Sequence, residues 1–137
     1  MSARHSYLST AELARLNHAC LPVAEAFPMS VYLVGSATER PDFRDVDVRV
    51  ILQDEEWDEL FAGKPFVWSL FCLGVNEYLS RVTGMPIDFQ VQRMTEANEK
   101  HPSAGSRIPL GKRHRPFAGG GDATPYTPAD IVAAAER

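Results

Sequence analysis

The sequence predicts one α+β domain built on a small mixed β-sheet flanked by helices, and three observations lead to this prediction. Short apolar and β-branched runs at residues 30–34, 45–52 and 87–92 are typical of strands. Segments with helix caps and helical spacing lie around them, in the order helix, strand, strand, helices, strand. The chain has 137 residues, 45% of them hydrophobic, which is enough for one buried core.

The first helix is expected from about residue 10 to residue 20. Ser9 and Glu12 have the spacing of a capping box, in which each side chain bonds the backbone N–H of the other residue. Apolar residues then follow at helical intervals. Pro22 and Pro28 are expected to bracket a loop or a broken turn before the strand at residues 30–34.

The second strand, residues 45–52, carries an unusual pair of acidic residues. Asp45 and Asp47 stand one residue apart in a strongly apolar run, although aspartate is disfavoured in strands. Because side chains alternate along a strand, Asp45, Asp47 and Arg49 are expected on one face and aliphatic residues on the other. The plain interpretation of this polar row is a solvent-facing strand that discourages edge pairing.

Two helices are expected between the second and third strands. Asp54 is expected to cap a short acidic helix over residues 55–61, and Pro65 to begin a longer one that ends before Gly84. Residues at i, i+3, i+4 and i+7 spacing predict the core stripe of the longer helix. They are Val67, Leu70, Phe71, Gly74, Tyr78 and Val82.

The third strand, residues 87–92, alternates aliphatic or aromatic side chains with Asp88, Gln90 and Gln92. The two glutamines are expected to be exposed strand residues rather than groups that recognise a base. Thr95 is expected to cap a short helix that ends near Lys100.

The domain boundaries follow from composition. Residues 1–117 are expected to form the domain, residues 118–126 a flexible linker, and residues 127–137 a C-terminal helix. The basic segment 107–115 is interpreted either as a solvated loop or as a basic lip that binds a triphosphate, RNA or an acidic partner.

Charge and composition limit the classes of function. The net charge of −4 argues against a dedicated nucleic-acid binder, so nucleic acid is only weakly supported as a partner. No apolar stretch reaches membrane-spanning length, and Cys20 and Cys72 are expected to be buried, reduced thiols. These features favour a cytoplasmic protein without a membrane partner.

The polar residues point to phosphate chemistry. If the second and third strands are neighbours, Asp45, Asp47 and Asp88 converge on one face, where a hard cation such as Mg²⁺ or Mn²⁺ would offset their repulsion. Such cations take phosphate oxygens as further ligands. Gly35 permits close backbone approach to a phosphate, and Ser36 offers a hydroxyl and an amide N–H.

The order Val34-Gly35-Ser36, eight residues, then Asp45-Val46-Asp47-Val48 resembles the signature of the DNA polymerase β-like nucleotidyltransferase superfamily. Ile87-Asp88-Phe89 resembles the later strand that carries its third carboxylate. The resemblance covers roughly residues 30–92 and is closest to the minimal single-domain members, including the small partners in some toxin–antitoxin pairs. It implies a nucleotidyltransferase-like fold.

The resemblance also implies roles. Asp45, Asp47 and Asp88 would bind the metal and act in catalysis, with Asp88 helping to deprotonate an unidentified hydroxyl acceptor. A second set, comprising Gly35, Ser36, Arg40 and Arg49, would bind the nucleoside triphosphate.

The role of Arg49 leaves two alternatives open. Arg49 would either bind a phosphate or neutralise the aspartates and displace the metal. In the second case the chain would be a catalytically silent module that binds a protein partner or a second copy. A different carboxylate–metal enzyme, such as a phosphohydrolase or nuclease, is a third possibility.

Overall fold

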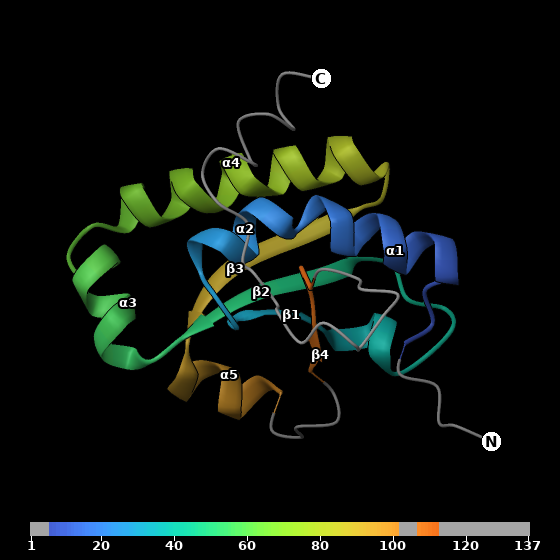
Figure 1. Ribbon diagram of the computed structural model, residues 1–137. Helices are drawn as coiled ribbons and strands as arrows, with labels where there is room; N and C mark the ends of the chain where they lie inside the picture. The colour runs from blue at the N-terminus through green and yellow to red at the C-terminus, as the bar shows by residue number, and fades with distance from the viewer. Residues whose placement is uncertain (1–5, 102–106, 113–137) are drawn as a thin grey trace, which may run out of the picture.

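The computed structural model describes residues 6–101 and 107–112, and it confirms an α+β fold with a mixed four-stranded sheet (Figure 1). The strands are β1 (Val31–Val34), β2 (Val46–Leu52), β3 (Ile87–Arg93) and β4 (Ile108–Pro109). Their spatial order is β3-β2-β1-β4. β2 and β3 are parallel, whereas β1 is antiparallel to both β2 and β4.

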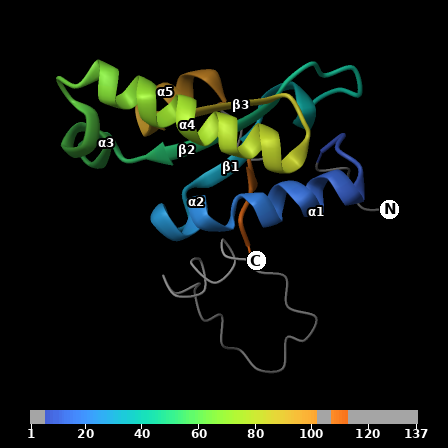
Figure 2. The same cartoon turned by 90° about the horizontal axis from the view of Figure 1, so that it is seen from above.

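The helices lie on both sides of this sheet. They are α1 (Thr10–Ala19), α2 (Leu21–Ala26), the short 3₁₀ helix η1 (Gly35–Thr38), α3 (Asp54–Phe61), α4 (Pro65–Thr83) and α5 (Met94–Lys100). Figures 1 and 2 show that α1, α2 and α4 cover one face, while α5 lies against the other. The main core therefore forms between the sheet and the layer of α1, α2 and α4.

The start of the chain follows its sequence signals closely. Ser9 and Glu12 form the expected capping box at the start of α1, with the backbone N–H of Ser9 donating to Glu12 Oε1 at 2.8 Å. The expectation of a loop after Pro22 is wrong, because α2 occupies Leu21–Ala26. Proline is tolerated in the first turn of a helix, where its missing N–H would have had no partner.

The expected caps of α3 and α5 are also wrong, because the two residues bond each other instead. Asp54 is the first residue of α3, not its cap, and its carboxylate accepts the backbone N–H of Thr95 at 3.1 Å and the Thr95 hydroxyl. These two hydrogen bonds lower the pKa of Asp54. They join the start of α3 to the first turn of α5.

The long helix α4 is rotated relative to its expected core stripe. Leu79 and Thr83 are fully buried, and Cys72 and the half-buried Phe71 face the core with them. The residues Val67, Leu70, Gly74, Tyr78 and Val82, expected in the core, are exposed instead. The helix ends as expected at Gly84, which adopts the left-handed conformation at φ 70°.

The outer edge of β3 is capped by side chains. The indole N–H groups of Trp57 and Trp68 both donate to the Val91 carbonyl, at 3.2 and 2.9 Å. Asn76 Oδ1 accepts the backbone N–H of Phe89 at 2.9 Å. Both tryptophans are half-buried, and they satisfy an edge group that would otherwise be free to pair with another strand.

The last described residues form a strand, β4, that the sequence did not predict. Residues 113–137, with the proposed linker and C-terminal helix, lie outside the described residues. Both Cys20 and Cys72 are free thiols, buried as expected. Within the described residues, no helix is long and apolar enough to cross a membrane.

Candidate functional site

The candidate site forms where three strand ends meet at one edge of the sheet. β1 runs antiparallel to β2, so the end of β1 lies beside the start of β2, and the start of parallel β3 lies next to it. The strand register places Val34 opposite Asp47, and Asp47 opposite Asp88. The turn after β1 therefore lies directly beside the expected carboxylates.

Gly35 packs against the carboxylate of Asp47. Its φ is +77°, a conformation that L side chains rarely adopt, and a Cβ built there would lie 2.1 Å from Asp47 Oδ2. The carbonyl of Ser36 accepts the N–H groups of Glu39 and Arg40, at 3.0 and 2.9 Å, and closes the turn. Only glycine fits at position 35 without displacing Asp47.

Asp47 and Asp88 form a coupled pair. Burial raises the pKa of Asp47, Arg49 lowers it, and the charges of Asp88 and Asp45 and a side-chain hydrogen bond with Asp88 raise it further. The net direction is upward. Asp45 is exposed at the bend just before β2, close enough for its charge to act on Asp47.

Arg49 lies on the same face and is 7% exposed. Its NH1 group donates to the carbonyls of Val48 and Asp88, at 3.0 and 2.5 Å. Its NH2 group lies 3.5 Å from Asp88 Oδ2 and 3.9 Å from Asp47 Oδ1. These separations exceed the roughly 2.7–2.9 Å of a charge-assisted hydrogen bond. Arg49 Nε is buried and has no hydrogen-bond partner among the described residues.

The charges at this edge do not balance. Within the described residues, Arg49 is the one cation within ion-pair distance of both Asp47 and Asp88. Burial is the main cause of the raised pKa of Asp47, and the charges of Asp88 and Asp45 add to it. Carboxylate oxygens of this kind suit a hard divalent cation. In the part of the chain that the structure describes, however, no three His, Cys, Asp or Glu side chains are grouped closely enough to hold a metal. The donor chemistry therefore suits a cation, but the carboxylates would have to come closer together to hold one.

An open cavity of about 350 Å³ adjoins Asp88 on the side away from Gly35, between α4 and β3. Its size is at the lower end of the range for small-molecule pockets. The lining residues are Asp45, Trp68, Ser69, Cys72, Leu73, Asn76, Ile87, Asp88, Phe89 and Gln90. The carboxylate pair thus has the glycine turn on one side and a hollow with polar and aromatic walls on the other.

Two basic residues that the sequence linked to phosphate binding, Arg40 and Arg107, contact other groups in the structure. Arg40 is exposed, and its Nε lies 3.5 Å from Asp42 Oδ1. Arg107, at the start of the basic segment, donates to Asn98 Oδ1 at 2.8 Å and to the His101 carbonyl at 3.2 Å. Residues 113–115 of that segment lie outside the described part of the chain.

Gln92, expected to be exposed, is 1% exposed. It lies on the face that carries Asp88, opposite Ile51 in the register, where α5 packs against β2 and β3. Its Oε1 atom has no hydrogen-bond partner within the described residues. The polar face is therefore covered by α5 at the far ends of β2 and β3 and open around Asp88.

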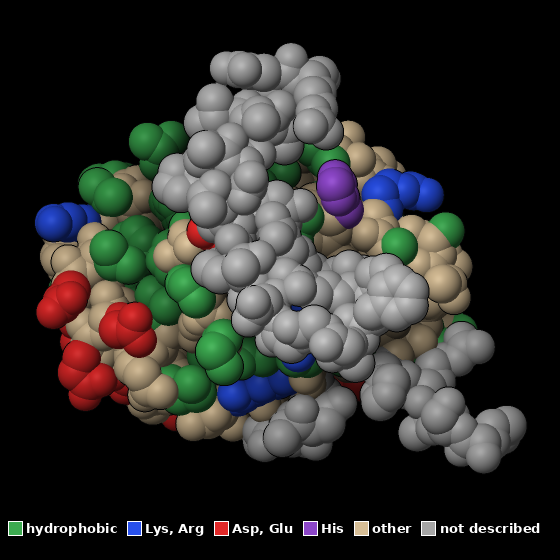
Figure 3. All heavy atoms as spheres, in the orientation of Figure 1, with side chains coloured by type: hydrophobic (Ala, Val, Ile, Leu, Met, Phe, Trp, Pro, Cys, Tyr) green, Lys and Arg blue, Asp and Glu red, His purple; other side chains and the backbone are tan. Residues whose placement is uncertain are grey.

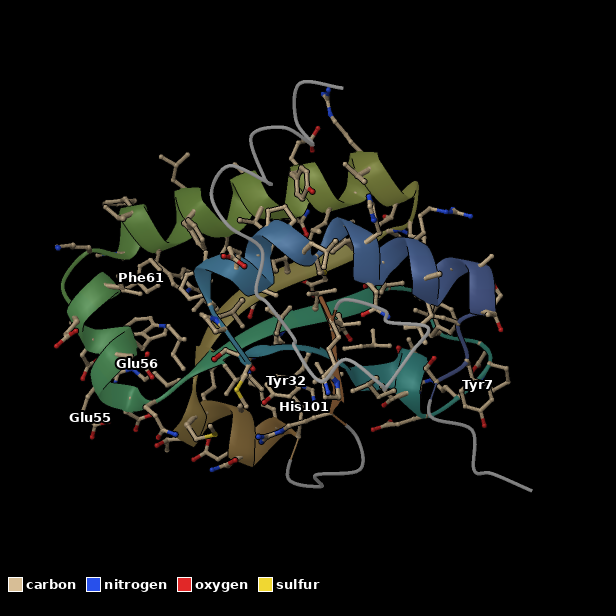
Figure 4. The ribbon with its side chains drawn as sticks, in the orientation of Figure 1. Tyr7, Tyr32, Glu55, Glu56, Phe61 and His101 are labelled. Carbon is tan, nitrogen blue, oxygen red and sulfur yellow. The ribbon has the colours of Figure 1, made fainter. Side chains whose placement is uncertain are left out.

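His101 is a nearby polar residue that the sequence did not single out. Figure 4 shows His101 and Tyr32 on the side of the sheet opposite α1 and α4. Burial lowers the pKa of His101, the charges of Arg49 and Arg107 lower it further, and Glu39 offsets part of the shift. No motif marks this histidine, because the fold alone brings it within reach of Arg49.

Comparison with family models, curated proteins and solved structures finds no match to this chain. The resemblance to nucleotidyltransferases therefore depends on the order and spacing of Gly35-Ser36, Asp45, Asp47 and Asp88. The architecture is compatible with that resemblance, because neighbouring strands carry Asp47 and Asp88 beside Gly35.

Proposed function

We propose that this domain is a metal-dependent nucleotidyltransferase that moves a nucleoside monophosphate from a nucleoside triphosphate to a hydroxyl group. The observation that carries the proposal is the contact of Gly35 with the Asp47 carboxylate beside Asp88, where Arg49 is the guanidinium close to both acidic groups. A divalent cation would offset the negative charge of the aspartates, and the bound triphosphate would bring further oxygen ligands to that cation.

The residues have distinct parts in this proposal. Asp47 and Asp88, with Asp45 at the rim, would hold Mg²⁺ or Mn²⁺, which neutralises phosphate charge when bound. The Gly35-Ser36 turn would hold the triphosphate, and the Arg49 guanidinium beside Asp47 and Asp88 would bind a phosphate oxygen. Arg40 is free to reach a terminal phosphate only if it leaves Asp42.

The acceptor would enter from the cavity beside β3. In-line displacement at the α-phosphorus requires the attacking oxygen and the leaving pyrophosphate on opposite sides. With the triphosphate over Gly35-Ser36, the opposite side is that of Asp88, whose carboxylate would accept the proton of the attacking hydroxyl. The side chain of Asp88 is 46% exposed, so an acceptor has access to it.

The experiment is a transfer assay with ATP, GTP, CTP and UTP labelled at the α-phosphate, in the presence of Mg²⁺ and a mixture of hydroxyl-bearing acceptors from a cell extract. The proposal expects pyrophosphate release together with transfer of the label, and loss of both in Asp88→Asn. Asp58→Asn, an exposed carboxylate on α3, is the matched control. Free phosphate or cleaved nucleic acid as the product would instead indicate a hydrolase.

One observation favours a second candidate, a catalytically silent module of the same fold that acts by binding a protein partner. NH1 of Arg49 is fixed by two backbone carbonyls, so the guanidinium stays beside Asp47 and Asp88 as a built-in cation. This candidate expects no pyrophosphate release with any triphosphate. It also expects partner binding that is unchanged by Asp47→Asn.

A further inference from the structure

Helix α4 is apolar on two sides, and only one of them packs against the sheet. Its inner side chains, such as Leu79, are buried in the core. Its outer side carries large hydrophobic side chains at helical spacing, which we call the outer stripe. They are Phe66 at 86% exposure, Val67 at 52%, Leu70 at 71%, Leu73 at 64% and Val82 at 46%, with Tyr78 at 38% on the edge next to α1, where its hydroxyl donates to the Ala19 carbonyl at 2.9 Å.

Such a stripe is unusual for a surface helix. A helix that is hydrophobic all round is normally buried, and contiguous apolar surface beyond a few hundred Å² marks an interaction site. Residues 65–76 of α4 contain no charged side chain. The charged residues of the helix, Glu77 and Arg81, pair with each other at 2.7 Å near its end.

Opposite charges flank the two ends of the outer stripe. At the start of α4, α3 carries Asp54, Glu55, Glu56, Asp58 and Glu59 and no basic residue. Figure 4 shows Glu55 and Glu56 on the outer side of α3, and Figure 3 shows acidic side chains gathered at that end beside hydrophobic ones.

The other end of the outer stripe carries Arg15 and Arg81. Arg15 of α1 donates to the carbonyl of Thr83 at 3.0 Å, and Arg81 lies one turn before the end of α4. Both arginines are exposed. The surface along α4 therefore runs from an end rich in carboxylates, through an uncharged apolar middle, to an end that carries Arg15 and the Glu77–Arg81 pair.

We propose that the outer stripe binds a second copy of this chain, with the two α4 helices packed antiparallel about a two-fold axis near Gly74. A two-fold interface joins the same patch on both copies and therefore requires a self-complementary surface. The antiparallel arrangement sets the acidic α3 of one copy opposite Arg15 and Arg81 of the other. A parallel arrangement would instead set acidic ends together.

The position of Gly74 supports this register. It is the middle residue of the Pro65–Thr83 helix, and a Cβ added there would meet no atom within 4 Å. A glycine at the crossing point lets two helices approach closely. With the axis at Gly74, Leu70 of one copy faces Tyr78 of the other, and Phe66 faces Val82.

The size of the stripe indicates a reversible dimer. A helix of 19 residues is about 28 Å long and, with side chains, about 10–12 Å wide. One such face covers roughly 300 Å², which is well below the roughly 800 Å² per partner of a standard interface. We therefore expect a weak dimer that dissociates on dilution. The inference does not depend on the proposed enzymatic activity.

The first test is sedimentation velocity of the full chain over a wide concentration range. The wild type should change from monomer to dimer as concentration rises, whereas Leu70→Glu should stay monomeric with an unchanged circular dichroism spectrum. Met29→Glu is the matched control, because Met29 is 93% exposed and lies off the stripe. A wild type that remains monomeric throughout, or a Leu70→Glu variant that dimerises equally well, would overturn the proposal.

The second test fixes the register by cross-linking. Gly74→Cys should link to itself, because the axis brings the two copies of position 74 together. Phe66→Cys and Val82→Cys should link efficiently only when the two variants are mixed. The wild type measures the background from Cys20 and Cys72. Self-linking of Phe66→Cys without self-linking of Gly74→Cys would contradict the antiparallel register.

Discussion

The two faces of the sheet differ sharply in composition. The face under α1, α2 and α4 consists of buried aliphatic and aromatic side chains, among them Leu33, Val48 and Phe89. The opposite face carries Asp47, Arg49 and Asp88 close together. Charges held near one another in a partly buried place cost stability. The contrast indicates that the first face maintains the fold, whereas the second carries the groups of the proposed site.

The strongest test of the first face is Leu33→Ala. Leu33 is fully buried and lies opposite Val48 in the register. Removing it leaves a cavity in the main core, and we expect the free energy of unfolding to fall by about 3 kcal/mol. Urea denaturation measures this loss. A loss below about 1 kcal/mol would show that this face is not the main source of stability.

On the charged face, Arg49→Met should lower the free energy of unfolding by about 2 kcal/mol at neutral pH. This loss is smaller than that expected for breaking a fully buried ion pair, because Asp88 is half exposed. The variant leaves Asp47 and Asp88 without their nearest cation. Because the pKa of Asp47 is raised, this carboxylate gains a proton as the pH falls and no longer needs the cation, so the loss should shrink in acid. Urea denaturation at several pH values measures it, and a loss independent of pH would indicate a packing effect alone.

Gly35→Ala tests the contact between the glycine turn and the carboxylates. We expect a loss of about 2 kcal/mol, because a Cβ would strain the backbone and push Asp47 aside. Gly63→Ala is the matched control, since Gly63 has φ +73° but nothing within 4 Å of an added Cβ. It should lose about 1 kcal/mol. Equal losses in urea denaturation would show that the contact with Asp47 adds nothing.

The smallest expected effect is that of Asp47→Asn on stability. In the folded state the pKa of Asp47 lies above its ordinary value of 3.8. Proton binding by Asp47 therefore favours the folded state, and this contribution to the free energy of unfolding is complete below pH 3.8. The contribution is lost as the pH rises through the folded-state pKa. Asparagine resembles the protonated form, so the variant should be at least as stable as the wild type at pH 7. The difference should vanish below about pH 4, and thermal unfolding against pH measures it.

The sequence predicted those elements whose signals are local. The capping box at Ser9, the strand pattern around Asp47 and Asp88, and the glycine that ends α4 all appear in the structure. The side of α4 that faces the core was not predictable in the same way. Both sides of that helix are apolar, so hydrophobic spacing did not distinguish the core side from the outer stripe.

Other features depend on contacts between distant segments. Asp54 and Thr95 each have the side chain of a cap, but they bond each other across the gap between α3 and α5. Gln92 is buried because α5 folds back over its strand. β4 has only two residues, and its pairing with β1 leaves no pattern in the sequence. Such outcomes follow from tertiary packing rather than from local propensity.

The central claim is that the charged face binds a nucleoside triphosphate together with a divalent cation. The most direct measurement is isothermal titration of the chain with a non-hydrolysable triphosphate of each base, with and without Mn²⁺. We predict binding that requires Mn²⁺, is lost in Asp47→Asn and is kept in Asp58→Asn. The absence of Mn²⁺-dependent binding in the wild type, or equal binding in all three proteins, would contradict the account.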